Sequence, residues 1–168
     1  MRLHSLRAMA CGFVAALLTV CAACSVDGHH GNGDDNYYSA FGTMSDAVWA
    51  YARPLNFTVD TLRDAGPVEG KLLLTVRHTA GYEYANLWLE LTTDLDHSAP
   101  DTINLRLADD YGRWLGKGSG PSVQIVDTLA RPVSLRRGQR LRLRHIMRTD
   151  SLQGIELAGI TFIPTSQE

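Results

Sequence analysis

Two runs of alternating apolar and polar residues, joined by a polar turn, constrain the fold of this chain more than any other feature. The alternating apolar positions are Leu87, Leu89 and Leu91 in the first run and Ile103, Leu105 and Leu107 in the second. A period of two places such residues on one face of a β-strand. The first strand is expected to open at Tyr82, and residues 94–100 have the composition of a turn. The sequence therefore predicts two strands at the centre of a β-sheet.

A glycine-rich segment follows, and it predicts a hairpin. Residues 112–120 hold four glycines around Trp114, so the backbone there can take positive φ. The segment contains Gly116-Lys117, but a phosphate-binding loop needs four residues between its first glycine and the Gly-Lys pair. Here only three residues separate Gly112 from Gly116, and Gly118 follows the lysine. No nucleotide is expected to bind.

The remaining chain repeats the strand pattern in short segments. Strands are expected at residues 55–59, 71–79, 122–127, 140–148 and 156–163. Residues 64–70 and 150–154 are expected to be turns, and residues 131–135, which contain Pro132, an edge strand or a connector. The segment around Trp49 fits either a strand or a short helical turn. Short strands without a long helical pattern predict an all-β protein, with a single antiparallel, jelly-roll-like β-sandwich domain over residues 37–168.

The N-terminus is typical of a bacterial lipoprotein signal peptide at residues 1–23. Arg2 and Arg7 precede an apolar run at residues 11–20, which is shorter than the roughly 20 residues that span a bilayer. Small residues then lead to Cys24, the expected lipidation site. Cys21 is less suitable, because the peptidase cuts directly before the lipidated cysteine and Val20 is bulky for the position before that cleavage site. An ordinary signal peptide that ends at Ala23 is the alternative.

Residues 24–36 form a polar, glycine-rich segment that is expected to be a flexible tether. Its histidines and aspartates could bind a metal ion weakly, but a solvated linker is favoured. A flexible segment must lose conformational freedom to hold a metal. All three cysteines lie within the first 24 residues, which excludes a disulfide framework in the domain. Removal of the signal peptide takes away Arg2 and Arg7 and leaves 14 basic and 18 acidic residues. This balance is unfavourable for nucleic-acid binding.

No catalytic pattern is present, so neither an enzyme nor a cofactor is expected. The sequence has no His-Glu-X-X-His and no Gly-X-Ser-X-Gly motif. The carboxylate pairs Asp94/Asp96 and Asp109/Asp110 are neighbours in loops, where turn formation is the favoured role.

Two groups of residues form a possible interaction surface. The first is an arginine stripe, in which Arg140, Arg142 and Arg144 alternate with Leu141, Leu143 and His145; its other members are Arg136, Arg137 and Arg148. A solvated face paired with acids such as Glu90, Asp109 and Asp110 is favoured over docking to an acidic protein or to anionic headgroups. Trp88 and Trp114 could form a sugar-binding platform if both were exposed side by side. Tryptophans, including Trp49, more often fill the core or cover a sheet edge.

Several motifs together resemble the gliding-motility lipoprotein GldH family of Bacteroidetes. They are Tyr82-X-Tyr84-X-Asn86-Leu87-Trp88-Leu89, Asp101-Thr102-Ile103, Leu107-Ala108-Asp109, Gly112-X-Trp114-Leu115-Gly116-X-Gly118-X-Gly120 and Met147-Arg148-X-X-X-Leu152-X-Gly154-Ile155. The resemblance covers the mature chain, and residues 101–120 are its most specific part.

The resemblance implies a β-rich, non-catalytic lipoprotein that is anchored to the outer membrane through its N-terminal lipid. It also implies an association with gliding-motility and type IX secretion proteins, with the leaflet left open. The alternative function is a surface lipoprotein that binds glycans through its tryptophans.

Overall fold

The computed structural model describes residues 37–63, 66–94 and 99–165. The described chain is built from strands and one short 3-10 turn, η1 (Ser45–Ala47). The strands are β1 (Tyr38–Thr43), β2 (Val48–Ala50), β3 (Leu55–Thr58), β4 (Val68–Thr79), β5 (Asn86–Thr93), β6 (Asp101–Arg106), β7 (Lys117–Ser119), β8 (Ser122–Thr128), β9 (Val133–Leu135), β10 (Arg140–His145), β11 (Ser151–Gln153) and β12 (Ile155–Pro164).

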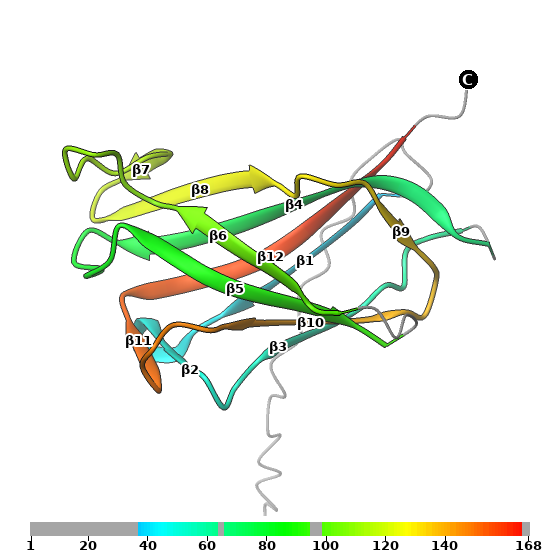
Figure 1. Ribbon diagram of the computed structural model, residues 1–168, viewed down its shortest axis with the longest axis horizontal. Coiled ribbons are helices and arrows are strands. Elements are labelled where there is room, and N and C mark those ends of the chain that lie inside the picture. Colours follow the sequence, from blue (N-terminus) through cyan, green and yellow to red (C-terminus); the bar gives the residue numbers. More distant parts are fainter. Residues whose placement is uncertain (1–36, 64–65, 95–98, 166–168) are drawn as a thin grey trace, which may run out of the picture.

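Two antiparallel sheets form a sandwich, which confirms the predicted all-β architecture (Figure 1). One sheet has the order β1-β12-β4-β8-β7, with β9 paired to β4, and the other has the order β3-β10-β5-β6. If the short strands β2, β7, β9 and β11 are left out, eight strands remain and can be counted from one to eight along the chain. Across the first sheet their order is then one, eight, three and six. Across the second sheet the order is two, seven, four and five. This nested order is the connection of a jelly roll.

The core lies between the two sheets and is formed by the alternating positions seen in the sequence. Leu87, Leu89 and Leu105 of the four-stranded sheet are completely buried. From the opposite sheet, Val76 and Ile160 are buried as deeply. A side-chain period of two therefore fixes which face of each strand is inside, because a shift by one residue would turn every leucine towards water.

The glycine-rich segment forms the predicted turns. Gly112, Gly116 and Gly120 all have positive φ, and β7 pairs with β8 in a hairpin. Gly116 is required most strictly, because its φ is 98° and a Cβ there would collide with the carbonyl oxygen of Gln124. Trp114 is paired with Ala108 in an isolated bridge. The segment has a structural role, as the sequence indicated.

Some of the predicted boundaries are wrong. The strand expected to open at Tyr82 begins at Asn86, because the Tyr82 N–H bonds to the Thr79 carbonyl in a turn and the Tyr82 hydroxyl donates to the Asn86 carbonyl. The strand expected to run to residue 148 ends at His145.

Two of the expected turns contain strand residues. Residues 68–70, placed in a turn by the sequence, extend β4 and pair with β9. Residues 151–153, also placed in a turn, form β11 and pair with β2, which settles the Trp49 segment as a strand. Strand β1 was not predicted.

The predicted signal peptide, Cys24 and the tether lie outside the described residues. Among residues 37–63, 66–94 and 99–165 there is no helix of the length and apolar character needed to cross a bilayer.

Candidate functional site

The outward face of the four-stranded sheet carries most of the residues that the sequence singled out. Alternation turns the polar positions of β3, β10, β5 and β6 away from the core. They are Asn56, Thr58, Arg140, Arg142, Arg144, Asn86, Trp88, Glu90, Thr92, Thr102, Asn104 and Arg106. We call this set the outer face. It is polar except at Trp88.

The predicted arginine stripe divides into paired and unpaired side chains. Arg144 lies opposite Glu90 in the β10–β5 register and donates to it over 2.7 Å, and its guanidinium lies 5.0 Å from the ring centre of Tyr51. Arg140 lies 3.3 Å from Asp94. Arg142 has no ion-pair partner within the described part of the chain. The predicted pairing with Glu90 is thus confirmed, and of the three arginines on β10 only Arg142 has no ion pair within the described residues.

The two aspartates expected to pair with this stripe are found elsewhere. Asp109 pairs with Arg113 over 2.7 Å, and Asp110 pairs with Arg106. Asp109 also accepts the N–H groups of Arg113 and Tyr111, and the Arg113 N–H is the largest cause that lowers the pKa of its carboxyl group. This is the turn role that the sequence favoured for the pair.

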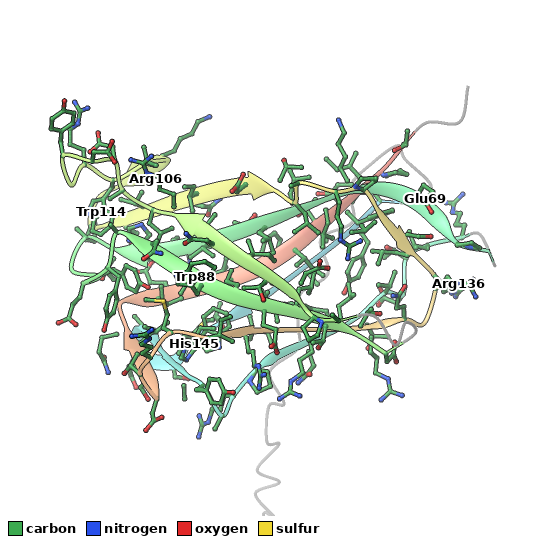
Figure 2. The ribbon with its side chains drawn as sticks, in the orientation of Figure 1. Glu69, Trp88, Arg106, Trp114, Arg136 and His145 are labelled. Atoms are coloured by element: carbon green, nitrogen blue, oxygen red, sulfur yellow. The ribbon has the colours of Figure 1, made fainter. Side chains whose placement is uncertain are left out.

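The three tryptophans have different environments. Trp49 is in the core, with 1% of its surface exposed, whereas Trp88 is 40% exposed on the outer face. Trp114 is half-buried and packs on the buried ring of His78, with 4.5 Å between the ring centres. Trp88 and Trp114 lie apart (Figure 2). The side-by-side pair that a Trp88/Trp114 sugar platform requires is therefore absent.

Trp88 instead shares a groove with residues that the sequence analysis did not connect with it as one site. This Trp88 groove has a volume of about 550 Å³ and is lined by Tyr84, Asn86, Trp88, Ile146, Met147 and Arg148. Tyr84 is 39% exposed. Period two could have indicated Asn86 as a partner of Trp88, since both lie on the same face of β5. No local signal connects Trp88 with Met147 and Arg148.

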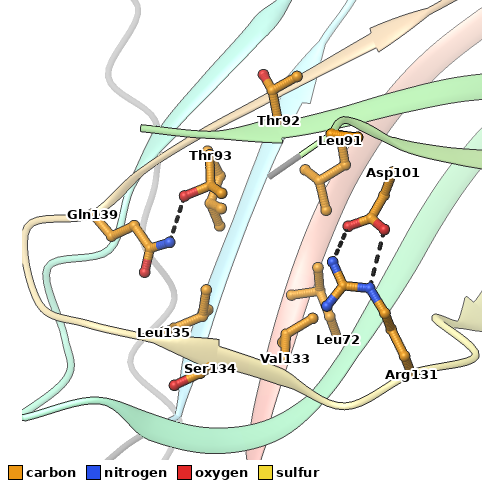
Figure 3. A pocket seen from close by; sticks show the side chains of 12 residues that line it. Leu72, Leu91, Thr92, Thr93, Asp101, Arg131, Val133, Ser134, Leu135 and Gln139 are labelled. Atoms are coloured by element: carbon orange, nitrogen blue, oxygen red, sulfur yellow. Dashed lines mark hydrogen bonds and ion pairs between the residues drawn. The ribbon is translucent and has the colours of Figure 1, made fainter. Parts of the chain in front are cut away.

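A smaller cavity lies between the two sheets, next to β9. Its volume is about 60 Å³, and apolar residues such as Leu72, Leu91 and Val133 line it (Figure 3). At its rim Arg131 binds Asp101 through two hydrogen bonds, and Gln139 donates to the Thr93 hydroxyl. A cavity of this size holds little more than water, so it is a packing gap closed by polar contacts.

Among the described residues, both histidines are buried completely. His145 lies edge-on to Trp49 and Tyr51, with ring centres 5.6 and 5.8 Å away, and burial lowers the pKa of its imidazole. The Nδ1 atom of His78 lies 2.9 Å from the Thr79 carbonyl oxygen. Residues 37–63, 66–94 and 99–165 contain no cluster of three or more histidine and acidic side chains that could hold a metal ion.

Solved structures show only distant likenesses. A Cry1Da tryptic core variant of Bacillus thuringiensis is 18% identical, with a TM-score of 0.42, over 68% of this chain and 17% of its own. Eiger TNF from S. frugiperda is 8% identical, with a TM-score of 0.43, over 79% and 95%. The GH26-CBM35 β-(1,4)-mannanase of Podospora anserina is 15% identical, with a TM-score of 0.38, over 86% and 25%. This chain thus corresponds to a small part of the first and third proteins. None of these likenesses bears on function.

The family comparison is decisive where the structural ones are weak. No curated protein matches the sequence. The family described as GldH lipoprotein matches residues 36–162, which include every strand of the sandwich except the last two residues of β12. The predicted family resemblance is confirmed: the chain belongs to the GldH lipoprotein family.

Proposed function

We propose that this protein is a lipid-anchored accessory subunit of the outer envelope that binds gliding-motility and type IX secretion proteins. The observation that carries the proposal is the family match, which spans nearly the whole folded domain. The signal peptide and Cys24 supply the anchor, since two or more acyl chains hold a protein stably at a membrane. The protein acts by binding and not by catalysis.

The outer face is the surface proposed for these partners. Arg142 projects from the middle of β10, between Asn56 of β3 and Thr92 of β5 in the register. An exposed arginine with no ion pair among the described residues can bind a carboxylate of a partner through two hydrogen bonds. An acidic surface of an envelope protein fits this position.

Site-specific photo-crosslinking in living cells tests the proposal. A photoreactive amino acid replaces Arg142 in one strain and Val126 in a control strain; Val126 is 51% exposed on β8 of the opposite sheet. We expect position 142 to capture motility or secretion subunits, identified by mass spectrometry, at least about tenfold more efficiently than position 126. Equal capture from both positions, or no such subunit from position 142, would contradict the proposal.

A further inference from the structure

The Trp88 groove combines exposed aromatic side chains with a volume suited to a ligand. Its two aromatic side chains, Trp88 and Tyr84, expose about two fifths of their surfaces. Large aromatic side chains on a soluble protein are normally more buried than this, because burying them contributes strongly to stability. Both aromatics line one groove of about 550 Å³, which is large enough for a small ligand.

Two backbone contacts of Trp88 fix the floor of the groove. The Ile146 N–H donates to the Trp88 carbonyl over 2.9 Å, and the Trp88 N–H donates to the sulfur of Met147 over 3.3 Å. The segment after β10 is thereby held against β5. These contacts fix the Trp88 backbone and the Met147 side chain relative to each other before a ligand arrives, which reduces the entropy lost on binding.

Paired amides lie beside the indole. Asn104 lies directly across from Trp88 on β6, and the Asn86 Nδ2 donates to the Asn104 Oδ1 over 2.7 Å. This contact orients both side chains. It leaves the Asn86 Oδ1 as an acceptor and the Asn104 Nδ2 as a donor, and the described residues offer neither atom another partner. An aromatic surface beside a fixed donor and a fixed acceptor matches a sugar ring, which has an apolar C–H face and a rim of hydroxyl groups.

Arg148 adds a charge preference. It is the one ionisable side chain of fixed charge in the groove lining, it is exposed, and it has no ion pair within the described residues. A guanidinium without an ion pair in the described part of the chain favours a ligand with a carboxylate, which it can bind through two parallel hydrogen bonds. The groove therefore suits an acidic sugar better than a neutral one.

The surroundings favour a glycan over a protein. The centre of a protein interface is usually a cluster of apolar anchors within a ring of contacts that exclude water. Next to Trp88 the sheet instead carries the polar side chains of Asn86 and Asn104, and Arg142, the proposed protein contact, lies farther along the sheet, beside Thr92. These side chains stay hydrated and can bind further hydroxyl groups along a chain of sugars.

We infer that the Trp88 groove binds a segment of an acidic polysaccharide. One sugar ring stacks on Trp88 and contacts Tyr84, its hydroxyl groups bind Asn86 and Asn104, and a uronate carboxylate binds Arg148. This binding site differs from the Trp88/Trp114 platform considered from the sequence, because Tyr84 takes the place of Trp114. It goes beyond the proposed function and does not depend on it.

Calorimetric titration of the full chain, purified in a detergent without a sugar headgroup, tests the inference. The probes are oligogalacturonate, its fully methyl-esterified form and oligoalginate. Esterification removes the negative charge and keeps the sugar ring. We expect at least one acidic probe to bind at least about fivefold more tightly than the ester, and Trp88→Ala to weaken that binding at least about tenfold.

Two further variants separate the roles of the residues. Arg148→Gln should remove the preference for the acid over its ester and leave binding of the ester unchanged. Tyr111→Ala is the matched control, since Tyr111 is an aromatic residue that is 86% exposed and does not line the groove. It should bind as the parent chain does. Thermal melting confirms that every variant is folded.

Three results would overturn the inference. They are the failure of every acidic probe to bind, undiminished binding by Trp88→Ala, and an equal loss in Tyr111→Ala. Failure here would leave the proposed function untouched, because the crosslinking experiment reads a protein partner from Arg142 and not a glycan.

Discussion

His145 is the residue whose burial has the clearest consequence. The sequence placed it on the leucine face of β10, and the structure confirms this position, with no measurable exposure. Burial lowers the pKa of its imidazole from the ordinary 6.5, and the nearby Trp49 backbone opposes this shift only in part. The folded protein therefore holds His145 in its neutral form.

We expect the free energy of unfolding to decrease as the pH falls through the ordinary histidine pKa of 6.5. Above that pH His145 is neutral in both states and contributes nothing. Below it the unfolded chain takes up the proton first, so acid favours unfolding by up to about 1.4 kcal/mol per pH unit for this one proton.

Urea unfolding of the parent chain and of His145→Leu, at about pH 7.5 and about pH 5, measures this effect. The loss of stability between the two pH values should be smaller in the variant. All other residues are identical in the two proteins, so the difference reports His145. An identical loss in both proteins would show that His145 does not titrate as described.

Strand β12 shows how closely the elements of the larger sheet pack. Gly159 lies directly opposite Phe41 of β1, and a Cβ at Gly159 would contact the Phe41 ring and lie 2.5 Å from the Ala40 carbonyl oxygen. The close approach uses the missing side chain of glycine and explains why this residue stands in the middle of a strand.

Gly159→Ala should therefore destabilise the fold by about 1–3 kcal/mol, the usual cost of overpacking. Gly118→Ala is the matched control, because its Cβ would meet its nearest neighbours at 3.5 and 3.8 Å, ordinary contact distances. Chemical denaturation of the two variants compares them. Similar losses at both positions would mean that strand propensity, and not the contact with β1, determines the effect.

At the scale of the elements, the sequence predicted the strands with bulky alternating residues and missed those without them. Leucine or isoleucine at every second position marks β5, β6 and β10 unambiguously. Strand β1 has small residues at Ser39, Ala40 and Gly42, so its hydrophobic period is weak. It forms because β12, more than a hundred residues later, offers a complete partner edge, and sequence patterns do not contain that pairing.

At the scale of the whole molecule, the candidate site needed the fold to be recognised. Trp88 and its own face were evident from the alternation of β5, as was the arginine stripe of β10. The Trp88 groove depends on the contact between Trp88 and Met147, which are 59 residues apart. The same fold places Trp114 against His78. Local patterns give the face of a residue but not its neighbours from distant strands.

The whole molecule also carries the central claim, which is that an N-terminal lipid and a jelly-roll domain together serve the secretion and motility apparatus. In the proposed function, the anchor is what brings the domain to the membrane, and the outer face is what binds the partners. The proposal requires both parts, so removal of the lipid should abolish function although the domain still folds.

The secreted proteome of a strain that lacks this protein tests the claim most directly. Cells are complemented with the parent chain, with Cys24→Ala, or with Cys21→Leu, which supplies the residue usual three positions before a lipidated cysteine. Deletion should retain type IX cargo inside the cell. The parent and Cys21→Leu should restore export, while Cys24→Ala is found in the soluble fraction and fails. Normal export after deletion, or full rescue by a soluble Cys24→Ala protein, would contradict the account.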